Sequence, residues 1–372
     1  MAGEPENQRI LCLTPLADVV ARIEALVKPV AAREVGLAAA LLRVLAEDVV
    51  APAGVPAQAR ALGDGYAVRA EDTADGGSYA PAPFAARPPR VDVGDVMPPG
   101  ADAVAPLDSV VERDGRFAAV APVAPGEGVL PINADLEAGA VLHRAGERLS
   151  AVDLAVLAAA GIDRVRLREP RIRLVKARPD RDLVLDSAVQ LLARAATAAG
   201  CDVQVDSGDL ATALTGEGAD AVIAVGGTGS GRNDASVRTL AGIGRVEVHG
   251  VALVPGETTA FGFVGARPVL LVPGRLDAAL AAWLVLGRRL LARLSACVDS
   301  EPTISGPLAR KVASPPGLAE VVPVRLRAGR GEPIASGYWP LQAMAQADGW
   351  ILVPAESEGF PAGAEVVVRR WP

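Results

Sequence analysis

The spacing of apolar residues predicts a helical start to the chain. Apolar side chains recur every three or four positions from Leu16 to Val27, which is typical of one face of a helix. Thr14 and Pro15, just before them, are typical of a helix N-terminus. A second short helix is expected from Leu37 to Leu45, so residues 14–48 are predicted to be helical.

The next part of the chain has a different pattern. Residues 49–59 carry no charge and two prolines, which is typical of a strand edge or a linker. Residues 60–136 are rich in Pro, Gly and Val, and short segments such as Phe117 to Val120 alternate with turns, which predicts β structure. Residues 137–168 return to a helical pattern, in which Ser150 can cap a helix that stops at Gly161.

After residue 171, apolar segments of strand length alternate with helical ones. The expected strands are Ile172 to Val175, Asp202 to Val205, Asp220 to Val225 and Leu270 to Val272, and the expected helices are Asp186 to Ala199, Asp234 to Ala241 and Leu276 to Leu294. This alternation predicts a parallel α/β domain. The tail, residues 301–372, has short Val/Arg alternations and is expected to form a small β domain.

Composition and charge narrow the class of protein. Hydrophobic residues make up 51% of the 372 residues and charged residues 22%, which excludes global disorder. The net charge of −7 argues against a nucleic-acid binder, because phosphate neutralisation requires a basic surface. The start of the chain does not resemble a signal peptide, and no apolar run approaches the ~20 residues of a membrane span. A soluble, cytoplasmic protein that binds neither membrane nor nucleic acid is therefore expected.

The cysteines and histidines do not indicate a metal site, a disulfide framework or a catalytic triad. The three cysteines and two histidines are not spaced as a metal site, and three cysteines do not make a disulfide framework. His143 and His249 have no triad partner by spacing, so we assign neither a role.

The strongest chemical candidate is the glycine-rich segment from Gly226 to Asp234, which follows an apolar strand and precedes a helix. Glycines let the backbone approach a ligand closely, and a helix N-terminus favours anions. Ser230 adds a hydroxyl donor and Arg232 a positive charge. A plain strand-to-helix turn is the alternative, but four glycines in six residues exceed what a turn needs. The segment matches neither the P-loop nor the GxGxxG pattern.

Other candidates are weaker one by one. Asp64 lies between two glycines, where an ordinary turn is the commoner explanation. Asp135 and Asp220 are most simply solvated charges, and Asp234 can cap the helix that follows it. Turn formation also explains two Pro-Gly pairs that end apolar strands, Pro255-Gly256 and Pro273-Gly274.

Taken in order, however, these segments resemble the molybdopterin molybdenumtransferase family, also called molybdenum insertases. The resemblance rests on Arg43 to Val49, Asp64 to Arg69, Pro99 to Val104, Asn133 to Asp135, the strand and glycine loop from Asp220 to Asp234, Pro255-Gly256 with Phe261-Gly262, Pro273-Gly274, Ser336 to Ala347 and Gly363 to Val366. It covers nearly the whole chain.

The resemblance implies a multidomain α/β plus β fold, an elongated four-part architecture with a parallel α/β molybdopterin-binding domain. Its parts are a helical domain at 10–48 and 137–170, an inserted β domain at 49–136, the α/β domain at 171–300 and a C-terminal β-barrel at 301–372. Our reading of the apolar pattern gives the same partition.

The resemblance also implies a homodimer with its site between the α/β domain of one subunit and the inserted domain of the other. Adenylylated molybdopterin is hydrolysed there with a divalent ion, expected to be Mg²⁺, molybdate enters the dithiolene, and AMP leaves. Asp64, Asp135 and Asp234 are the expected catalytic residues, with Asp64 and Asp234 holding the ion. The expected ligand-binding residues are Gly226, Gly227, Thr228, Ser230, Gly231, Arg232, Asp220, Pro255, Gly256, Pro273, Gly274 and Arg275.

The chain departs from the family pattern at several of these positions. Val93 replaces a threonine, and the region of the family's Thr-Gly-Asp-Glu reads Lys176-Ala177-Arg178-Pro179-Asp180, without the Thr and the Glu. The serine of the glycine loop becomes Gly229, Lys-Pro-Gly-Lys-Pro reads Val254-Pro255-Gly256-Glu257-Thr258, and Pro-Gly-Asn-Pro reads Pro273-Gly274-Arg275-Leu276. Each lost charge-assisted phosphate contact costs ~1.5–3 kcal/mol. Either Arg178, Arg232 and Arg275 rebuild the phosphate site, or the site has decayed.

Three functions remain open. The first is an insertase-like protein of molybdenum-cofactor biosynthesis that acts on molybdopterin or its adenylylated form. The second is a non-catalytic carrier or scaffold that delivers the cofactor to a client molybdoenzyme. The third is a duplicated copy that binds another nucleotide or anion through the same loop.

Overall fold

The structure, a computed structural model, describes residues 8–178, 182–298 and 302–371. Its internal contacts divide the chain into two compact units. The first comprises Met1–Glu47, Ala145–Ser150 and Arg166–Pro372, and the second comprises Asp48–Arg144 and Ala151–Val165. No helix among the described residues is both long enough and apolar enough to cross a membrane.

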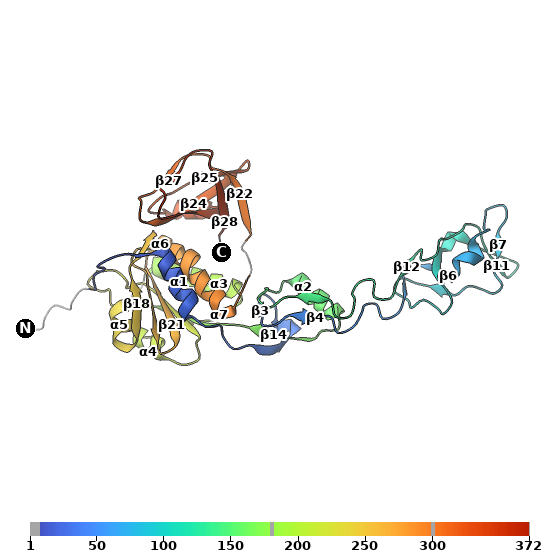
Figure 1. Cartoon of the computed structure of the whole chain (residues 1–372), viewed down its shortest axis with the longest axis horizontal. Coiled ribbons are helices and arrows are strands. Elements are labelled where there is room, and N and C mark those ends of the chain that lie inside the picture. The colour runs from blue at the N-terminus through green and yellow to red at the C-terminus, as the bar shows by residue number, and fades with distance from the viewer. Residues whose placement is uncertain (1–7, 179–181, 299–301, 372) are drawn as a thin grey trace, which may run out of the picture. The chain divides into compact units, whose positions relative to one another are not determined.

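A six-stranded sheet with helices on both faces forms the centre of the first unit (Figure 1). Its strand order is β16-β15-β17-β21-β20-β18. The strands are β15 (Arg171–Lys176), β16 (Asp202–Asp206), β17 (Ala221–Val225), β18 (Arg245–His249), β20 (Ala260–Val264) and β21 (Arg267–Val272). Strands β15, β16, β17 and β21 are parallel, as predicted. The two further strands were not predicted: β20 runs antiparallel to β21, and β18 pairs antiparallel with β20, so β18 runs in the same direction as β21.

The central strand β17 is buried on both faces. Ala221, Ile223 and Val225 join a core with α1 (Leu16–Leu26), α3 (Leu183–Ala198), α6 (Leu276–Ala282) and α7 (Arg288–Ser295). Val222 and Ala224 join a second core with α4 (Leu210–Thr215) and α5 (Ser236–Ile243). The continuous apolar run of β17 therefore follows from burial on two sides. A π-helical turn, Trp283–Gly287, links α6 to α7.

The N-terminal prediction needs two corrections. The helix begins at Leu16, because Thr14–Pro15 forms strand β1, which pairs in parallel with Val251 and Ala252 of β19 (Val251–Val254). The second helix, expected from Leu37 to Leu45, is absent: a 3₁₀ turn at Leu37–Ala39 lies between two strands. These are β2 (Arg33–Gly36) and β3 (Val44–Leu45), which flank β14 (Arg164–Arg168) in a three-stranded sheet. Pairing with β14 overrides a weak helical pattern.

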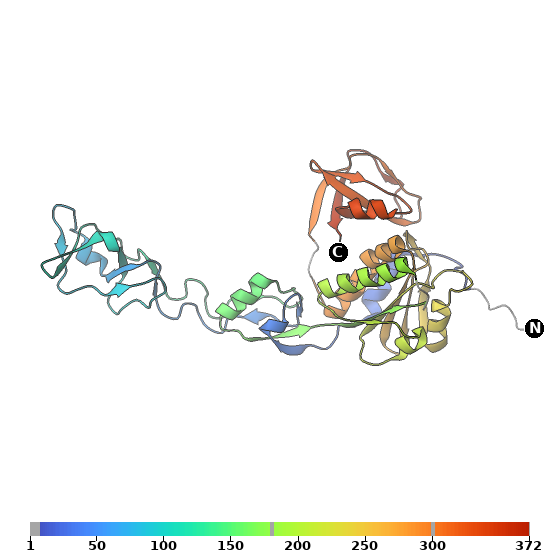
Figure 2. The same cartoon turned by 180° about the vertical axis from the view of Figure 1, so that it is seen from behind.

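The C-terminal segment forms a second, sheet-rich part of this unit (Figure 2), as predicted. Its main sheet has the order β1-β19-β24-β26-β28-β22, with β25 paired to β24. Its elements are β22 (Thr303–Pro307), β23 (Val312–Ala313), β24 (Ala319–Arg327), β25 (Arg330–Pro333), α8 (Leu341–Gln346), β26 (Gly349–Val353), β27 (Gly359–Phe360) and β28 (Glu365–Arg370).

The second unit is built mainly of short strands, in agreement with the β pattern of residues 60–136. The strands are β4 (Val49–Val50), β5 (Arg60–Ala61), β6 (Gly65–Val68), β7 (Ala82–Pro83), β8 (Arg90–Val91), β9 (Ala103–Pro106), β10 (Val110–Arg113), β11 (Arg116–Ala119), β12 (Val129–Leu130) and β13 (Val141–His143). Of the helical pattern predicted for residues 137–168, only the helix after Ser150 is present, as α2 (Ala151–Ala159). The rest of that prediction is wrong, because Val141–His143 pairs with β4 as β13 and Arg164–Arg168 pairs with β3 as β14.

The order of the strands also marks where a ligand can bind. The chain leaves β15 through α3 to reach β16 on one side, and returns through α4 to reach β17 on the other. Because α3 and α4 cover opposite faces, the loops at the carboxyl ends of β15 and β17 diverge. A crevice at such a reversal of strand order is the usual ligand site of an open α/β sheet.

Candidate functional site

The glycine loop follows β17 at this reversal, and its first two glycines are required by its shape. Gly226 and Gly227 have φ of 99° and 71°, a region that favours glycine. A Cβ atom on Gly227 would overlap Oγ of Ser236. Ser236 fixes the loop to the start of α5, because its backbone N–H donates to Gly227 O at 3.0 Å and its hydroxyl donates to Gly226 O at 2.7 Å.

Two further turns adjoin the loop. Gly226 N–H donates to Val272 O at 2.8 Å, and a Cβ atom on Gly274 would lie 3.4 Å from Gly226 Cα. On the other side, the hydroxyls of Thr228 and Thr258 are 2.8 Å apart. The structure therefore brings the Pro273-Gly274 turn and the segment after Pro255-Gly256 next to the glycine loop.

The loop keeps several backbone donors open. Within the described parts of the chain, no acceptor is found for the N–H groups of Thr228, Gly229 and Ser230. Neighbouring open N–H groups beside a helix N-terminus form a cradle for an anion such as phosphate. We call these three groups the amide cradle.

Asp234 faces this loop rather than the helix. Its carboxylate Oδ2 accepts from Gly231 N–H at 2.9 Å and lies 2.8 Å from the position of a Cβ atom on Gly229. The expected helix cap is therefore absent: α5 has Ala235 at its N-cap and no side-chain hydrogen bond from that residue. A carboxylate is thus held at the edge of the amide cradle.

The three arginines that could replace the missing lysines differ in their partners. Arg275 donates to the buried carboxylate of Asp277 at 3.1 and 2.6 Å, and this hydrogen bond raises the pKa of Arg275. Arg178 lies 3.8 Å from Asp182. Arg232 is exposed and has no ion-pair partner among the described residues. Arg232 is therefore the arginine of the three whose charge is most available to a ligand.

The remaining positive charge near β15 also has an acidic partner. Lys176, the last residue of β15, donates to Asp186 at 2.6 Å. Pro179 and Asp180, in the region of the family's Thr-Gly-Asp-Glu, lie outside the described residues. Glu257 accepts from Gly256 N–H at 3.0 Å and adds a negative charge close to Arg275.

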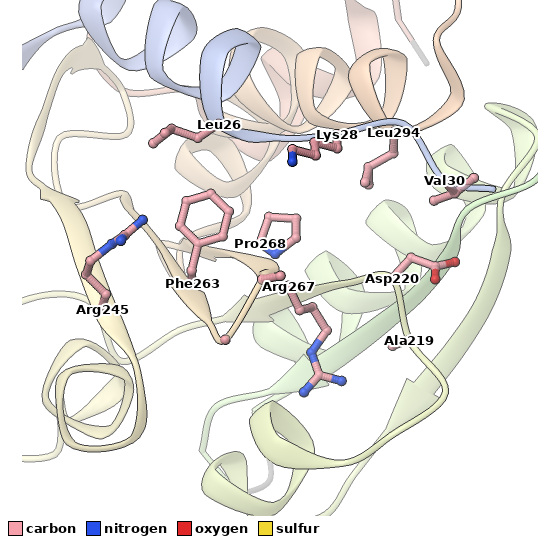
Figure 3. A pocket seen from close by; sticks show the side chains of 12 residues that line it. Leu26, Lys28, Val30, Ala219, Asp220, Arg245, Phe263, Arg267, Pro268 and Leu294 are labelled. Carbon is pink, nitrogen blue, oxygen red and sulfur yellow. The ribbon is translucent and has the colours of Figure 1, made fainter.

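The structure does not bring Asp220 to the glycine loop. Asp220 precedes β17 at the opposite end of the strand, where its carboxylate accepts from Arg171 Nη2 at 2.9 Å and Nε at 3.2 Å. A cavity of about 440 Å³ opens at that edge, lined by Lys28, Phe263 and Arg267 as well as Asp220 (Figure 3). This cavity is separate from the amide cradle, and none of the loop residues lines it.

Asp64 and Asp135 belong to the second unit and are both exposed. Asp64 accepts from Val93 N–H at 2.9 Å, so the residue that replaces the family's threonine binds the predicted catalytic carboxylate. The backbone N–H of Asp135 donates to Val55 O at 3.0 Å.

No cluster of three or more metal-ligating side chains exists in the described chain. Asp234 is the carboxylate at the amide cradle. Mg²⁺ is commonly bound through one or two carboxylates together with substrate phosphates rather than in an all-protein cage. The residues present therefore fit an ion that arrives with a phosphate ligand, not a preformed metal centre.

Sequence reasoning missed two side chains that fix the loop. Gln8 is buried against it and donates to Gly227 O at 2.7 Å and to Gly229 O at 2.8 Å. His249 Nε2 lies 3.1 Å from Thr228 O. Neither belongs to a recognisable motif, and Gln8 is more than 200 residues away in the sequence. Only the fold reveals these contacts.

The chain is similar along most of its length to proteins of molybdenum-cofactor biosynthesis. Family profiles match in sequence order: the MoeA N-terminal region (domains I and II) at residues 14–161, a probable molybdopterin binding domain at 173–293, and the MoeA C-terminal region (domain IV) at 305–371. The glycine loop lies inside the second match.

Individual proteins similar to this chain are also named as proteins of molybdopterin biosynthesis or as molybdopterin molybdenumtransferases. A putative molybdopterin biosynthesis protein of Methanocaldococcus jannaschii is 28% identical, covering 90% of this chain and 91% of the relative. A molybdopterin molybdenumtransferase of Haemophilus influenzae is 28% identical over 73% of this chain and 75% of its own length. The crystal structure of the molybdopterin biosynthesis MoeA protein from Pyrococcus horikoshii matches with a TM-score of 0.77 and 26% identity, covering 97% of this chain and all of that one.

Fold, site and relatives define a molybdenum-cofactor biosynthesis protein with a molybdopterin-binding domain. The chain belongs to the molybdopterin molybdenumtransferase family. This confirms both the resemblance and the four-part fold class stated from the sequence, while the exact boundaries of the four parts remain a prediction.

Proposed function

We propose that the amide cradle binds a phosphate of adenylylated molybdopterin and that this protein inserts molybdate into the pterin with release of AMP. The observation that carries the proposal is the set of open N–H groups of Thr228, Gly229 and Ser230 at the reversal of strand order. Such donors offset phosphate charge without a counter-ion, because they are already oriented before the ligand arrives.

Each residue around the cradle has a proposed task. Arg232 supplies the mobile positive charge, and arginine suits phosphate because its guanidinium can donate two parallel hydrogen bonds. The Thr228 and Thr258 hydroxyls orient the ligand from the side of the loop. In the hydrolysis, water adds to one phosphorus of the phosphoanhydride, the bridging P–O bond breaks, and AMP takes the bridging oxygen or the water oxygen according to which phosphorus is attacked.

Asp234 is the residue that would hold Mg²⁺ in this proposal, by its position at the cradle. When bound, the ion would neutralise phosphate charge during the displacement. Without an ion, the carboxylate repels a phosphate, so binding of the phosphate ligand is expected to depend on Mg²⁺.

We extend the proposal to a homodimer, in which Asp64 and Asp135 act on a ligand held by the other subunit. An exposed apolar surface on α2 supports association, since the side chains of Val152 and Val156 are 70% and 45% exposed. Sedimentation of a monomer at micromolar concentration would contradict this part of the proposal.

A second function, a carrier that holds molybdopterin for a client molybdoenzyme without turnover, is favoured by two observations. Glu257 stands in place of a family lysine, and Arg275 is already bound to Asp277. Both features weaken charge stabilisation of a reacting phosphate more than they weaken recognition of the pterin.

One reaction separates these functions. Purified protein is incubated with adenylylated molybdopterin, Mg²⁺ and molybdate, and AMP is measured by chromatography. Release of AMP supports the insertase. Stoichiometric binding without AMP supports the carrier, and absence of binding contradicts both. Gly227→Ala, which blocks the loop conformation, is the negative control.

A further inference from the structure

The side chain of Gln8 makes contacts that a merely packed residue would not make. Its Nε2 group donates to the carbonyl oxygens of Gly227 and Gly229, and its own backbone carbonyl accepts from the Ser230 hydroxyl at 2.9 Å. The residue is only 7% exposed. One neutral amide therefore bonds two alternate peptide groups of the glycine loop at once.

Peptide geometry gives this contact a consequence. A trans peptide group is planar, and its N–H points opposite to its C=O. The carbonyl of Gly227 shares a peptide with Thr228 N–H, and that of Gly229 shares a peptide with Ser230 N–H. Turning both carbonyls toward Gln8 therefore turns both N–H groups away from it, and these N–H groups belong to the amide cradle.

The same side chain also serves the helix behind the loop. The α5 helix has no side-chain cap from Ala235, and Gln8 Oε1 accepts from Arg238 N–H, in the first turn, at 3.3 Å. The NH₂ group and the oxygen of one side-chain amide thus fix the position of the loop relative to the N-terminus of the α5 helix.

We propose that Gln8 is a positioning residue that holds the glycine loop with its N–H groups directed at the phosphate of the ligand. This inference rests on the proposed function, because it assigns the cradle a phosphate. It assigns an ordering role to a residue that does not itself touch the ligand. Orientation of the N–H groups should contribute more to phosphate binding in this chain than in relatives whose lysines supply positive charge, because the acids Asp234 and Glu257 lie nearby here.

The opposite arrangement is physically distinct and predicts the opposite sign. If Gln8 occupied the space of the anion, its removal would free the loop and tighten binding. The bonds from Nε2 to carbonyl oxygens place Gln8 on the acceptor side of the loop, so we expect removal to weaken binding.

The test measures AMP binding by isothermal titration calorimetry in the presence of Mg²⁺, using the full chain, Gln8→Ala and Gln8→Glu. Gln8→Ala is expected to lower the affinity about ten-fold, because a misoriented loop should lose about one hydrogen bond to the phosphate. Gln8→Glu keeps the acceptor for α5 but places an oxygen against both carbonyls, so its loss is expected to be at least as large. Gln190→Ala, the same change on the exposed surface of α3, should leave the affinity unchanged.

A second readout distinguishes positioning from stability. In ¹⁵N-labelled protein, AMP should shift the Thr228 and Ser230 amide resonances of the wild type much more than those of Gln8→Ala. Melting temperatures measured on the same samples give the folded fraction. A destabilised variant that still binds AMP with wild-type affinity, or a variant that binds more tightly, overturns the role of Gln8 and leaves the proposed function intact. A wild-type chain that binds no AMP overturns both.

Discussion

The polar groups at the two ends of the parallel strands of the six-stranded sheet differ in whether they have a partner. At the amino edge of the sheet, where the parallel strands begin, the Asp220 carboxylate accepts two hydrogen bonds from the Arg171 side chain, and a cavity of about 440 Å³ lies beside them. At the carboxyl edge, where these strands end, three backbone N–H groups of the glycine loop have no acceptor among the described residues. We therefore expect an anion to bind at the carboxyl edge, because a donor without an acceptor can be satisfied by a ligand, whereas the charge at the amino edge is already paired.

The largest expected effect on AMP affinity comes from a substitution that changes the shape of the glycine loop at the carboxyl edge. In Gly227→Ala, the added Cβ would overlap Ser236 Oγ at a φ of 71°, so the loop must change shape. We expect AMP affinity to fall at least about a hundred-fold, because all cradle donors move together. Gly265→Ala is the control at the amino edge: its φ of 61° gives a similar backbone cost, ~1–2 kcal/mol, but its Cβ meets open space. Calorimetry should show wild-type AMP affinity for this control.

Two arginines at the carboxyl edge sharpen the comparison. Arg232→Ala should lower AMP affinity about ten-fold with little change in melting temperature, because Arg232 is exposed. Arg275→Ala should do the reverse, since it leaves Asp277, only 3% exposed, without its charged partner. The expected loss of stability is ~1–2 kcal/mol, reduced by the exposure of the guanidinium. Equal effects of both variants on affinity would show that Arg275 also reaches the ligand.

A charge reversal tests whether the carboxyl edge has lost affinity relative to the family. Glu257→Lys restores the family's residue and removes a carboxylate near the site. We expect AMP to bind several-fold more tightly at low salt, with the gain shrinking as salt is added. Unchanged affinity would place Glu257 outside the ligand's reach.

The smallest effect is expected at the amino edge. Asp220→Asn removes one charge of a partly exposed pair and should cost less than ~1 kcal/mol of stability. Its AMP affinity should equal that of the wild type. A ten-fold loss of affinity would move the binding site to this edge and contradict the comparison.

The sequence predicted the inner strands β15, β17 and β21 well because their apolar runs are almost continuous and buried on both faces of the sheet. It failed where local pattern and pairing disagree. Leu37 to Leu45 is apolar enough for a helix, but Val44–Leu45 pairs with β14 instead. Strands β18 and β20 were not predicted either, and neither was the reversed direction of β20, which depends on its pairing with β21 on one side and β18 on the other.

The candidate site also contains residues that the sequence predicted and residues that it did not. Gly226, Gly227 and the Pro273-Gly274 turn were predicted because glycine and proline carry their backbone requirement in their chemistry. Gln8 and His249 were missed because a polar side chain gives no sign of a partner distant in sequence. The orientation of Asp234 toward Gly231 rather than toward α5 depends on the same tertiary geometry.

The most direct test is a crystal structure of this protein soaked with AMP and Mg²⁺. The account predicts phosphate oxygens within hydrogen-bonding distance of the backbone N–H groups of Thr228 and Ser230, with Gln8 still bound to the carbonyls behind them. A nucleotide found instead in the cavity beside Lys28 and Asp220, with the loop unchanged, would contradict it.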